Sequence, residues 1–178
     1  KTTGNDNIFL ATRNGMAICF NENDARAVGR TASGVKAIDL ADGDYVVGAE
    51  PVREDSKVLL VTDGGYGKCT DLTSFRIQHR GGKGLKAYKI TEKTGNIIGI
   101  SMVNDSEELI MVTSEGVVIR IRIKDIATTT GRITQGVRLI NLDDGVTVVS
   151  MDKISAEDAV EEESEENNTE VTTETTEE

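Results

Sequence analysis

The sequence contains no tryptophan, one proline, one histidine and two cysteines among 178 residues. The two cysteines, Cys19 and Cys69, are too few for a disulfide framework, which fits a reducing, cytoplasmic location. A zinc site needs three or four ligands close together, so this composition predicts no metal site. We also find no nucleophile paired with a base in the sequence, and we expect no catalytic residues in this chain.

Leader and membrane segments are also missing. The chain opens on Lys1, and no charged segment followed by an apolar one comes after it. We therefore expect a fragment of a longer protein without a signal peptide. No apolar run approaches the ~20 residues that cross a bilayer, so we expect a soluble protein with no membrane partner.

The negative charge is concentrated at one end. The formal net charge is −11, from 31 acidic and 20 basic residues. Residues 156–178 hold 11 of the acids and no base, which leaves 20 of each sign in residues 1–155. The terminal segment is rich in Glu and Thr and has no aromatic residue, so it cannot bury enough surface to fold. We predict a folded body over 1–155 and a disordered acidic tail over 156–178.

One pattern occurs three times, with a period of 50 to 52 residues. Each copy opens with a Thr-x-x-Gly turn and continues with an Arg-x-x-x-Gly-apolar-base element. A glycine before a β-branched pair is the third landmark. The turns are 12–15, 62–65 and 113–116, the basic elements are 30–36, 80–86 and 132–138, and the pairs begin at Val46, Ile97 and Val148. Three landmarks at one period indicate duplication.

A period near fifty residues with strand chemistry is typical of propeller blades. Within a repeat we predict four short strands, rich in Val, Ile and Thr and separated by turns, for example 45–50, 57–62, 66–72 and 84–90. In the third copy Ile119, Ile121 and Ile123 share one face of a strand, opposite two arginines.

No stretch of the sequence sustains a helical apolar stripe. We therefore predict an all-β, propeller-like array of four-stranded blades. A single blade has too small a core to stand alone, so the blades must pack on their neighbours. The repeats cover about 5–45, 46–95 and 96–151, and about three blades would be half of a closed ring.

Charge follows the same repeat. The segments 13–36, 65–89 and 116–138 together hold 15 bases and 4 acids, whereas the rest of 1–155 holds 5 bases and 16 acids. Equivalent positions of successive blades lie side by side in a radial array, so these segments should merge into one basic band. A solvated, salt-bridged surface is the plainer interpretation of any single base, but recurrence in three copies favours DNA.

Such a band can follow the phosphates of duplex DNA, one per ~1.7 Å of helix axis, without reading sequence. A curved band bends the duplex, which costs roughly 1–6 kcal/mol over 20–30 base pairs. The side chains that we predict to contact DNA are Arg30, Lys36, Lys68, Arg76, His79, Arg80, Lys83, Lys86, Arg120, Arg122, Arg132 and Arg138.

The repeated Arg-x-x-x-Gly-[Val/Leu]-[Lys/Arg] element resembles that of the C-terminal domain of bacterial type II topoisomerase A subunits. The second copy, Gln78-His79-Arg80-Gly81-Gly82-Lys83-Gly84, resembles the gyrase A box Gln-Arg-Arg-Gly-Gly-Lys-Gly, with His79 in place of the first arginine. In that loop Lys83 is a better candidate for a phosphate contact than His79. The glycines permit either a close backbone approach to phosphate or a tight turn. The resemblance covers residues 5–155, and acidic tails are typical of gyrase A subunits.

The resemblance implies a six-bladed β-pinwheel whose neighbouring blades exchange strands and around which double-stranded DNA wraps. It further implies ATP-dependent negative supercoiling by an A2B2 heterotetramer, formed with the rest of the gyrase A subunit together with the gyrase B subunit. ATP and Mg²⁺ would be used elsewhere in that assembly, so no cofactor is expected in this chain. The active tyrosine would also lie elsewhere, and we interpret Tyr45, Tyr66 and Tyr88 as packing residues in strands.

The sequence departs from the family pattern at two places. The box lies in the family's first blade, but only one full repeat follows the box-like copy here, so we interpret that copy as the penultimate blade. Cys19 and Cys69 occupy the position of Arg120 in the third copy, which weakens the basic band and argues against cysteine chemistry.

Two alternatives remain open. The C-terminal domain of a topoisomerase IV A subunit would show the same repeats, although the acidic tail favours gyrase. A protein-interaction propeller is the more distant alternative, and the lack of Gly-His and Trp-Asp signatures argues against a WD-repeat form of it. We also expect the tail to compete with DNA for the basic band.

Overall fold

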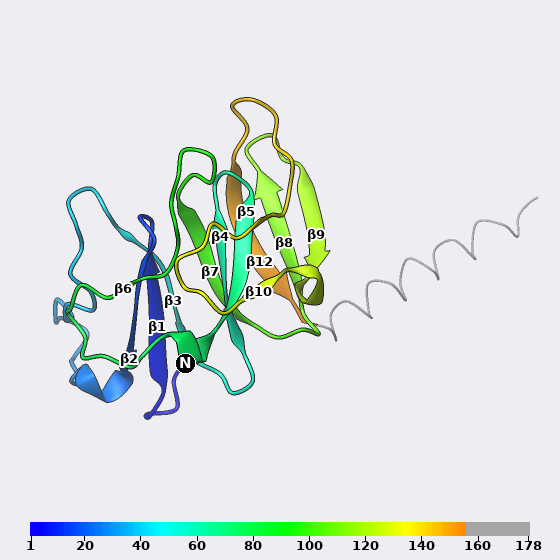
Figure 1. Cartoon of the computed structure of the whole chain (residues 1–178). Helices are drawn as coiled ribbons and strands as arrows, with labels where there is room; N and C mark the ends of the chain where they lie inside the picture. Colours follow the sequence, from blue (N-terminus) through cyan, green and yellow to red (C-terminus); the bar gives the residue numbers. More distant parts are fainter. Residues whose placement is uncertain (156–178) are drawn as a thin grey trace, which may run out of the picture.

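The computed structural model describes residues 1–155, and the predicted acidic tail lies outside the described residues. The described chain forms three β-sheets that stand side by side (Figure 1), and its helical structure is limited to three 3-10 turns. The all-β prediction is therefore confirmed. The strands are β1 (Asn7–Thr12), β2 (Met16–Asn21), β3 (Val46–Pro51), β4 (Lys57–Thr62), β5 (Tyr66–Asp71), β6 (Leu85–Lys86), β7 (Ile97–Val103), β8 (Glu108–Thr113), β9 (Val118–Arg122), β10 (Thr128–Thr129), β11 (Val137–Arg138) and β12 (Val148–Ile154), and the 3-10 turns are η1 (Glu22–Asp24), η2 (Leu72–Ser74) and η3 (Ile123–Asp125).

Each sheet is one blade, built on the same three-stranded antiparallel core. Blade 1 has the order β3-β1-β2, blade 2 has β7-β4-β5 and blade 3 has β12-β8-β9. In every blade the strand that comes first along the chain lies in the middle, and a register shift interrupts its pairing with the strand that comes last. This recurrence confirms the propeller-like array of about three blades.

Additional strands come from the following repeat. β6 pairs with β2 of blade 1, whereas β10 and β11 both pair with β5 of blade 2. We call the segments that carry these strands, and the equivalent segment of the first repeat, arms: arm 1 is 25–39, arm 2 is 75–89 and arm 3 is 126–141. Arm 2 thus docks on blade 1, and arm 3 docks on blade 2.

The four segments predicted as strands of one repeat all contain strands, but they do not form one sheet. The strand at 46–51 pairs with β1 in blade 1, the next two strands form blade 2, and the strand at 85–86 returns to blade 1. A pattern of hydrophobic residues specifies a strand without specifying its partner, so the sequence alone did not assign each strand to a sheet.

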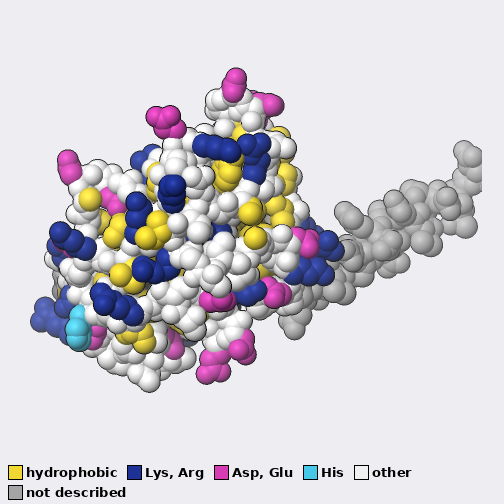
Figure 2. All heavy atoms as spheres, in the orientation of Figure 1, with side chains coloured by type: hydrophobic (Ala, Val, Ile, Leu, Met, Phe, Trp, Pro, Cys, Tyr) yellow, Lys and Arg dark blue, Asp and Glu magenta, His cyan; other side chains and the backbone are white. Residues whose placement is uncertain are grey.

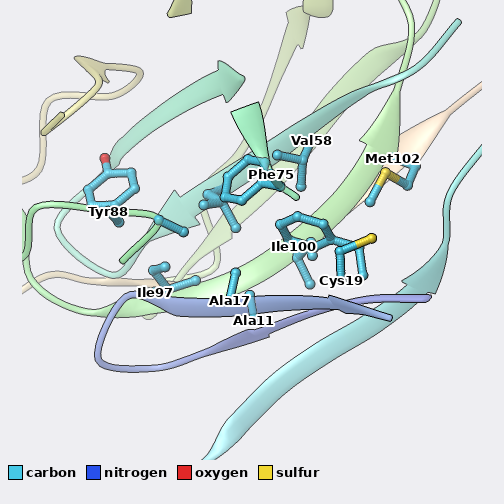
Figure 3. Packing of buried hydrophobic residues seen from close by; sticks show 12 residues of the cluster. Ala11, Ala17, Cys19, Val58, Phe75, Tyr88, Ile97, Ile100 and Met102 are labelled. Carbon is cyan, nitrogen blue, oxygen red and sulfur yellow. The ribbon is translucent and has the colours of Figure 1, made fainter. Parts of the chain in front are cut away.

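The core lies between the blades. In β4, Val58 and Leu60 face blade 1, whereas Leu59 and Val61 face blade 3, and all four are fully buried. Figure 3 shows the cluster between blades 1 and 2, where Ala11 and Ala17 of blade 1 lie opposite residues of blade 2. Because β4 buries both faces, each blade depends on its neighbours, as expected for a stacked array.

Two side-chain predictions need correction. Tyr66 and Tyr88 are buried, although Tyr88 lies after β6 rather than in a strand. Tyr45 is not a packing residue: it precedes β3, is 55% exposed, and holds its ring 5.9 Å from the Arg13 guanidinium. In the third copy the predicted alternation is confirmed within β9, but Ile123 begins η3 instead of extending the strand.

Candidate nucleic-acid interface

The three arms lie next to one another, held by contacts that repeat from one pair of arms to the next. Arg80 Nη1 of arm 2 donates to the Lys36 carbonyl of arm 1 at 2.9 Å. The equivalent Arg132 Nη1 of arm 3 donates to the Lys86 carbonyl of arm 2 at 3.4 Å. These hydrogen bonds place the Arg-x-x-x-Gly-apolar-base elements side by side in the order arm 1, arm 2, arm 3.

Main-chain hydrogen bonds follow the same rule. The Asp39 amide donates to the Gly82 carbonyl at 2.8 Å, and the equivalent Lys89 amide donates to the Thr134 carbonyl at 3.0 Å. Lys and Arg side chains run across the face shown in Figure 2, and Asp and Glu lie mainly toward its margins. The arms therefore bring together bases that are about fifty residues apart in sequence.

We define the basic band as the exposed Lys and Arg of the arms. Its members are Arg26, Arg30, Lys36, Arg76, Lys83, Lys86, Lys89 and Arg138. Arg30, Arg76, Lys83 and Lys86 form no ion pair within the described residues, so their charge is directed to solvent. Arg26 and Lys89 lie in the basic segments of the repeat but were not among the predicted DNA contacts. The structure adds them to the band because both residues are exposed.

Other predicted bases are partly neutralised by carboxylates. Lys36 forms an ion pair with Asp39, and Arg120 forms one with Glu108 across β8 and β9. Arg122 Nε lies 2.8 Å from an Asp125 oxygen. Because these partners compensate the positive charge, we expect Arg120 and Arg122 on blade 3 to contribute less to an anion site than the free bases of arm 2.

His79 and Arg80 of the box-like copy contact the chain before arm 1. The His79 side chain is 99% exposed, with Nδ1 3.3 Å from the Asp24 carboxylate. Arg80 is half-buried, and its Nε donates to the Asp24 carbonyl at 2.8 Å. Arg80, like Arg132, therefore orders the backbone of a neighbouring segment. The sequence predicted only a direct DNA contact for these two arginines.

Lys68 is the clearest correction to the predicted contacts. Its side chain is completely buried in β5, and Nζ donates to the Arg132 carbonyl at 2.5 Å and to the Thr134 hydroxyl at 3.1 Å. Burial, together with the nearby Arg132 charge, lowers the pKa of Lys68 to about 8. A base in this position holds arm 3 from beneath and cannot reach a phosphate.

The glycines of the box-like loop serve the docking of arm 2. Gly84 has φ +72°, and a Cβ there would lie 2.4 Å from the Ala17 carbonyl oxygen of β2. Gly81 also has positive φ, whereas the φ of Gly82 is not positive, and a Cβ at Gly82 would be in ordinary contact with the His79 carbonyl oxygen at 3.8 Å. The Gln78 main-chain amide donates to the Cys19 carbonyl at 2.8 Å, and Lys83, between Gly82 and Gly84, is exposed to solvent.

A further cationic cluster surrounds the Tyr66 hydroxyl. Arg138 Nε and Nη2 donate to this oxygen at 3.1 and 3.0 Å, and Lys93 Nζ lies 5.6 Å from the Tyr66 ring. Hydrogen bonding from Arg138 is the main reason that the pKa of Tyr66 is lowered. Lys93 was not predicted as a site residue, because it lies in a connection whose overall charge is acidic, and only the fold places it beside arm 3.

Other kinds of site find little support in residues 1–155. No three His, Cys, Asp or Glu side chains of this part of the chain are grouped so that they could hold a metal ion. Cys19 and Cys69 are buried free thiols, and burial raises the pKa of Cys69 to about 11. Within these residues, no helix is long and apolar enough to cross a membrane.

Stacked blades that receive arms from the following repeat define a β-propeller-like repeat protein. The family model described as DNA gyrase C-terminal domain, beta-propeller, matches residues 6–53, 56–104 and 107–155, one match per blade. The chain belongs to the DNA gyrase C-terminal domain family.

Curated relatives agree with this assignment. The DNA gyrase A subunit of Staphylococcus epidermidis (strain ATCC 12228 / FDA PCI 1200) is 46% identical over 159 residues, which cover 88% of this chain and 18% of the relative. The DNA gyrase A subunit of Ureaplasma parvum serovar 3 is 46% identical over 151 residues, with 85% and 18% covered. The chain thus spans about a fifth of the length of these relatives.

Solved structures show the same architecture. A C-terminal domain of DNA topoisomerase IV superposes with a TM-score of 0.84 at 27% identity, over 95% of this chain and 53% of that one. A DNA gyrase A C-terminal domain superposes with a TM-score of 0.78 at 26% identity, over 84% of this chain and 51% of that one. The three blades therefore correspond to about half of each of these domains.

Proposed function

We propose that the basic band binds double-stranded DNA without sequence preference and bends it, as part of a DNA gyrase A subunit. The observation that carries this proposal is the repeated arm-to-arm contact, Arg80 to Lys36 and Arg132 to Lys86, which aligns the basic elements. Phosphates are the ligands that a row of exposed, unpaired bases fits best. Contacts of this kind fix the position of a duplex and carry no sequence information.

The band has to offset the cost of curving the duplex. Bending 20–30 base pairs costs roughly 1–6 kcal/mol, which several phosphate contacts can offset. Arm 2 contributes the densest group of free bases, Arg76, Lys83 and Lys86, so we expect DNA to be held most tightly there. Arm 3 contributes Arg138, with Lys93 beside it.

The wider role follows from membership of the family. In this proposal the chain acts in the cytoplasm within an A2B2 assembly, formed with the rest of the gyrase A subunit together with the gyrase B subunit. The wrapped duplex supports ATP-dependent negative supercoiling, with ATP and Mg²⁺ bound by other parts of the assembly. The described residues serve a non-catalytic, DNA-positioning function.

A topoisomerase IV A subunit is the second candidate, supported by the TM-score of 0.84 to a C-terminal domain of DNA topoisomerase IV. The two candidates differ in the product of the complete assembly. We expect the gyrase assignment to give negative supercoiling of relaxed plasmid with ATP. Efficient decatenation without supercoiling would support the alternative.

Salt dependence of DNA binding tests the proposed contact. Affinity for a random-sequence duplex is measured by mobility shift at several salt concentrations, and ~6 phosphate contacts predict a log–log slope near −5. A second duplex of different sequence is the control and should give the same affinity. An affinity that does not respond to salt would contradict the proposal and would favour a protein-interaction propeller.

A further inference from the structure

A cavity of about 230 Å³ lies where arm 3 passes from blade 2 to blade 3. Its lining combines three polar side chains with three apolar ones: Tyr66, Lys93 and Arg138, and Ile140, Leu142 and Val146. None of the described residues that line this cavity is acidic. A second cavity, beside β9, differs because Glu108 and Asp125 lie next to its arginines and compensate their charge.

The two cations of the first cavity share one buried tyrosine. Lys93 Nζ and the central carbon of the Arg138 guanidinium each lie 5.6 Å from the centre of the Tyr66 ring. Tyr66 is only 7% exposed, whereas both bases are exposed. Neither base forms an ion pair within residues 1–155. Like charges held close together repel each other, so this arrangement favours the binding of an anion between them.

Hydrogen-bond donors converge on the same cavity. The Tyr66 hydroxyl accepts from Arg138 Nε and Nη2, and a phenol that accepts still has its own O–H to donate. Arg138 Nη1 donates to Asn141 Oδ1 at 2.8 Å, and the guanidinium has further N–H groups beyond these three bonds. Hydrogen bonding from Arg138 is the main reason that the pKa of Tyr66 is lowered, and Lys93 acts in the same direction. The surroundings of this oxygen therefore stabilise negative charge.

The cluster is specific to blade 2 and is not a general feature of the repeat. Tyr66 directly follows the turn glycine of its copy, and Lys93 lies two residues before the glycine that precedes the last strand. The equivalent positions carry neither the hydroxyl nor the positive charge. They are Met16 and Val117 for Tyr66, and Ala41 and Asp143 for Lys93. The recurrence of bases that defines the arms therefore does not explain this group.

We propose that the cavity is a pocket for one phosphate group, bound by the Tyr66 hydroxyl, the Lys93 ammonium and the Arg138 guanidinium. A phosphate group offers negative charge and several acceptor oxygens, which matches three donors of which two are cationic. The cavity volume is several times the ~30 Å³ that a water molecule occupies in the liquid, so a phosphate group fits with water around it.

The phosphate group can come from two sources with the same chemistry. Arg138 belongs to the basic band, so one source is a backbone phosphate of a bound duplex. In that case the inference rests on the proposed function and adds one fixed phosphate position to the band. The other source is a free phosphate or a phosphomonoester, which the pocket would bind independently of DNA.

Inorganic phosphate tests the pocket without DNA. The chain has three tyrosines, so ring labelling of the full-length protein gives an NMR probe in the pocket, Tyr66, and an exposed reference, Tyr45. At constant ionic strength, phosphate should shift the Tyr66 signal with saturation and leave Tyr45 unchanged. Lys93→Gln should weaken phosphate binding about tenfold, because it removes a hydrogen bond between charged groups. The matched control is Lys57→Gln, which removes a lysine outside the pocket lining and should have no effect.

A duplex identifies the source of the phosphate. If the group belongs to DNA, a saturating duplex should shift the Tyr66 signal. Tyr66→Phe should then weaken DNA binding severalfold without changing the salt slope, because the phenol that is lost carries no charge. Tyr45→Phe is the matched control and should bind DNA like the unmodified chain. If inorganic phosphate shifts the Tyr66 signal and a bound duplex does not, the ligand is a free phosphate or a phosphomonoester.

Two results would overturn the pocket. The first is a Tyr66 signal that shows no saturable shift with inorganic phosphate or with a bound duplex. The second is equal phosphate affinity of Lys93→Gln and Lys57→Gln. Mobility-shift titration of the same proteins measures DNA binding separately, so a chain that binds DNA while the Tyr66 signal stays unchanged would contradict the pocket and leave the proposed function intact.

Discussion

Arg80 donates through Nη1 to the main-chain carbonyl of Lys36 at 2.9 Å, so a base of one repeat holds the backbone of the preceding basic element. Arg132 stands in the same relation to Lys86. These arginines give the array its continuity, and they leave the neighbouring lysines exposed. In arms 2 and 3, one arginine therefore orders the neighbouring backbone, while other bases of the same arm face solvent.

Removing the free lysines of arm 2 should weaken DNA binding without unfolding the protein. We expect Lys83→Ala together with Lys86→Ala to reduce the magnitude of the log–log salt slope by about 2, at ~0.9 per phosphate contact. Mobility-shift titrations measure the slope, and urea unfolding checks stability. The control is Lys57→Ala, since Lys57 lies outside the basic band and forms an ion pair with Asp105. An unchanged salt slope in the double variant would show that Lys83 and Lys86 of arm 2 do not contact phosphates.

Lys68 should make stability depend on pH in the alkaline range. Its pKa is about 8 in the folded chain, against an ordinary value of 10.5, so the unfolded chain binds more protons between these values. The free energy of unfolding should therefore rise as pH increases from 8 to 10.5, by up to about 3 kcal/mol for this group, and this contribution should be constant below pH 8.

Urea unfolding across this pH range, for the unmodified chain and for Lys68→Met, isolates the contribution because other groups titrate in both proteins. We expect the difference between the two curves to follow the titration of Lys68. The variant should keep the salt slope of DNA binding, since the side chain is completely buried. A loss of about one unit of slope would show that Lys68 does reach phosphate.

Gly84→Ala should destabilise the docking of arm 2. The residue has φ +72°, and a Cβ there would lie 2.4 Å from the Ala17 carbonyl. The left-handed backbone alone costs roughly 1–2 kcal/mol for a residue with a side chain. Gly82→Ala, whose nearest atom would be 3.8 Å away, is the matched control and should be neutral or slightly stabilising. Denaturant midpoints measure both, and equal midpoints would contradict the docking geometry.

Deleting residues 156–178 removes 11 acids and no base. If this segment competes with DNA for the basic band, the deletion should tighten binding, and the effect should be largest at low salt because screening weakens the competition. Affinities of the full chain and of 1–155 at two salt concentrations measure the effect. A matched variant with the acids of this segment replaced by Gln and Asn separates charge from length, and it should behave like the deletion.

Much of the fold was predictable because the repeat is regular. Landmarks such as the glycine before Val46, Ile97 and Val148 identify the start of the last strand in each blade. The docking of arms on the preceding blade was not predictable from the residues, since the sequence of Leu85 and Lys86 does not specify which blade edge they pair with. The resemblance to the family did imply strand exchange, but the pairing partner is decided by close approaches such as Gly84 to Ala17, which appear only in three dimensions.

The site was predicted in outline and less well in detail. Charge at recurrent positions identified the arms, but Lys68 was assigned to the surface because it is basic. Its counterparts in the other copies, Ile18 and Ile119, mark an inward-facing position and could have signalled burial. Lys93 could not have been found from the sequence, because its proximity to Tyr66 results from packing between segments that are distant along the chain.

Energy transfer between dyes at the two ends of a duplex of about 30 base pairs tests the central claim most directly, because a duplex of that length is short compared with the ~150 base-pair persistence length of DNA. If the three arms form one curved surface for DNA, transfer should increase as the full chain binds and should fall back in the Lys83→Ala, Lys86→Ala variant. Saturated binding with no change in transfer would show that the duplex stays straight, and it would contradict the account.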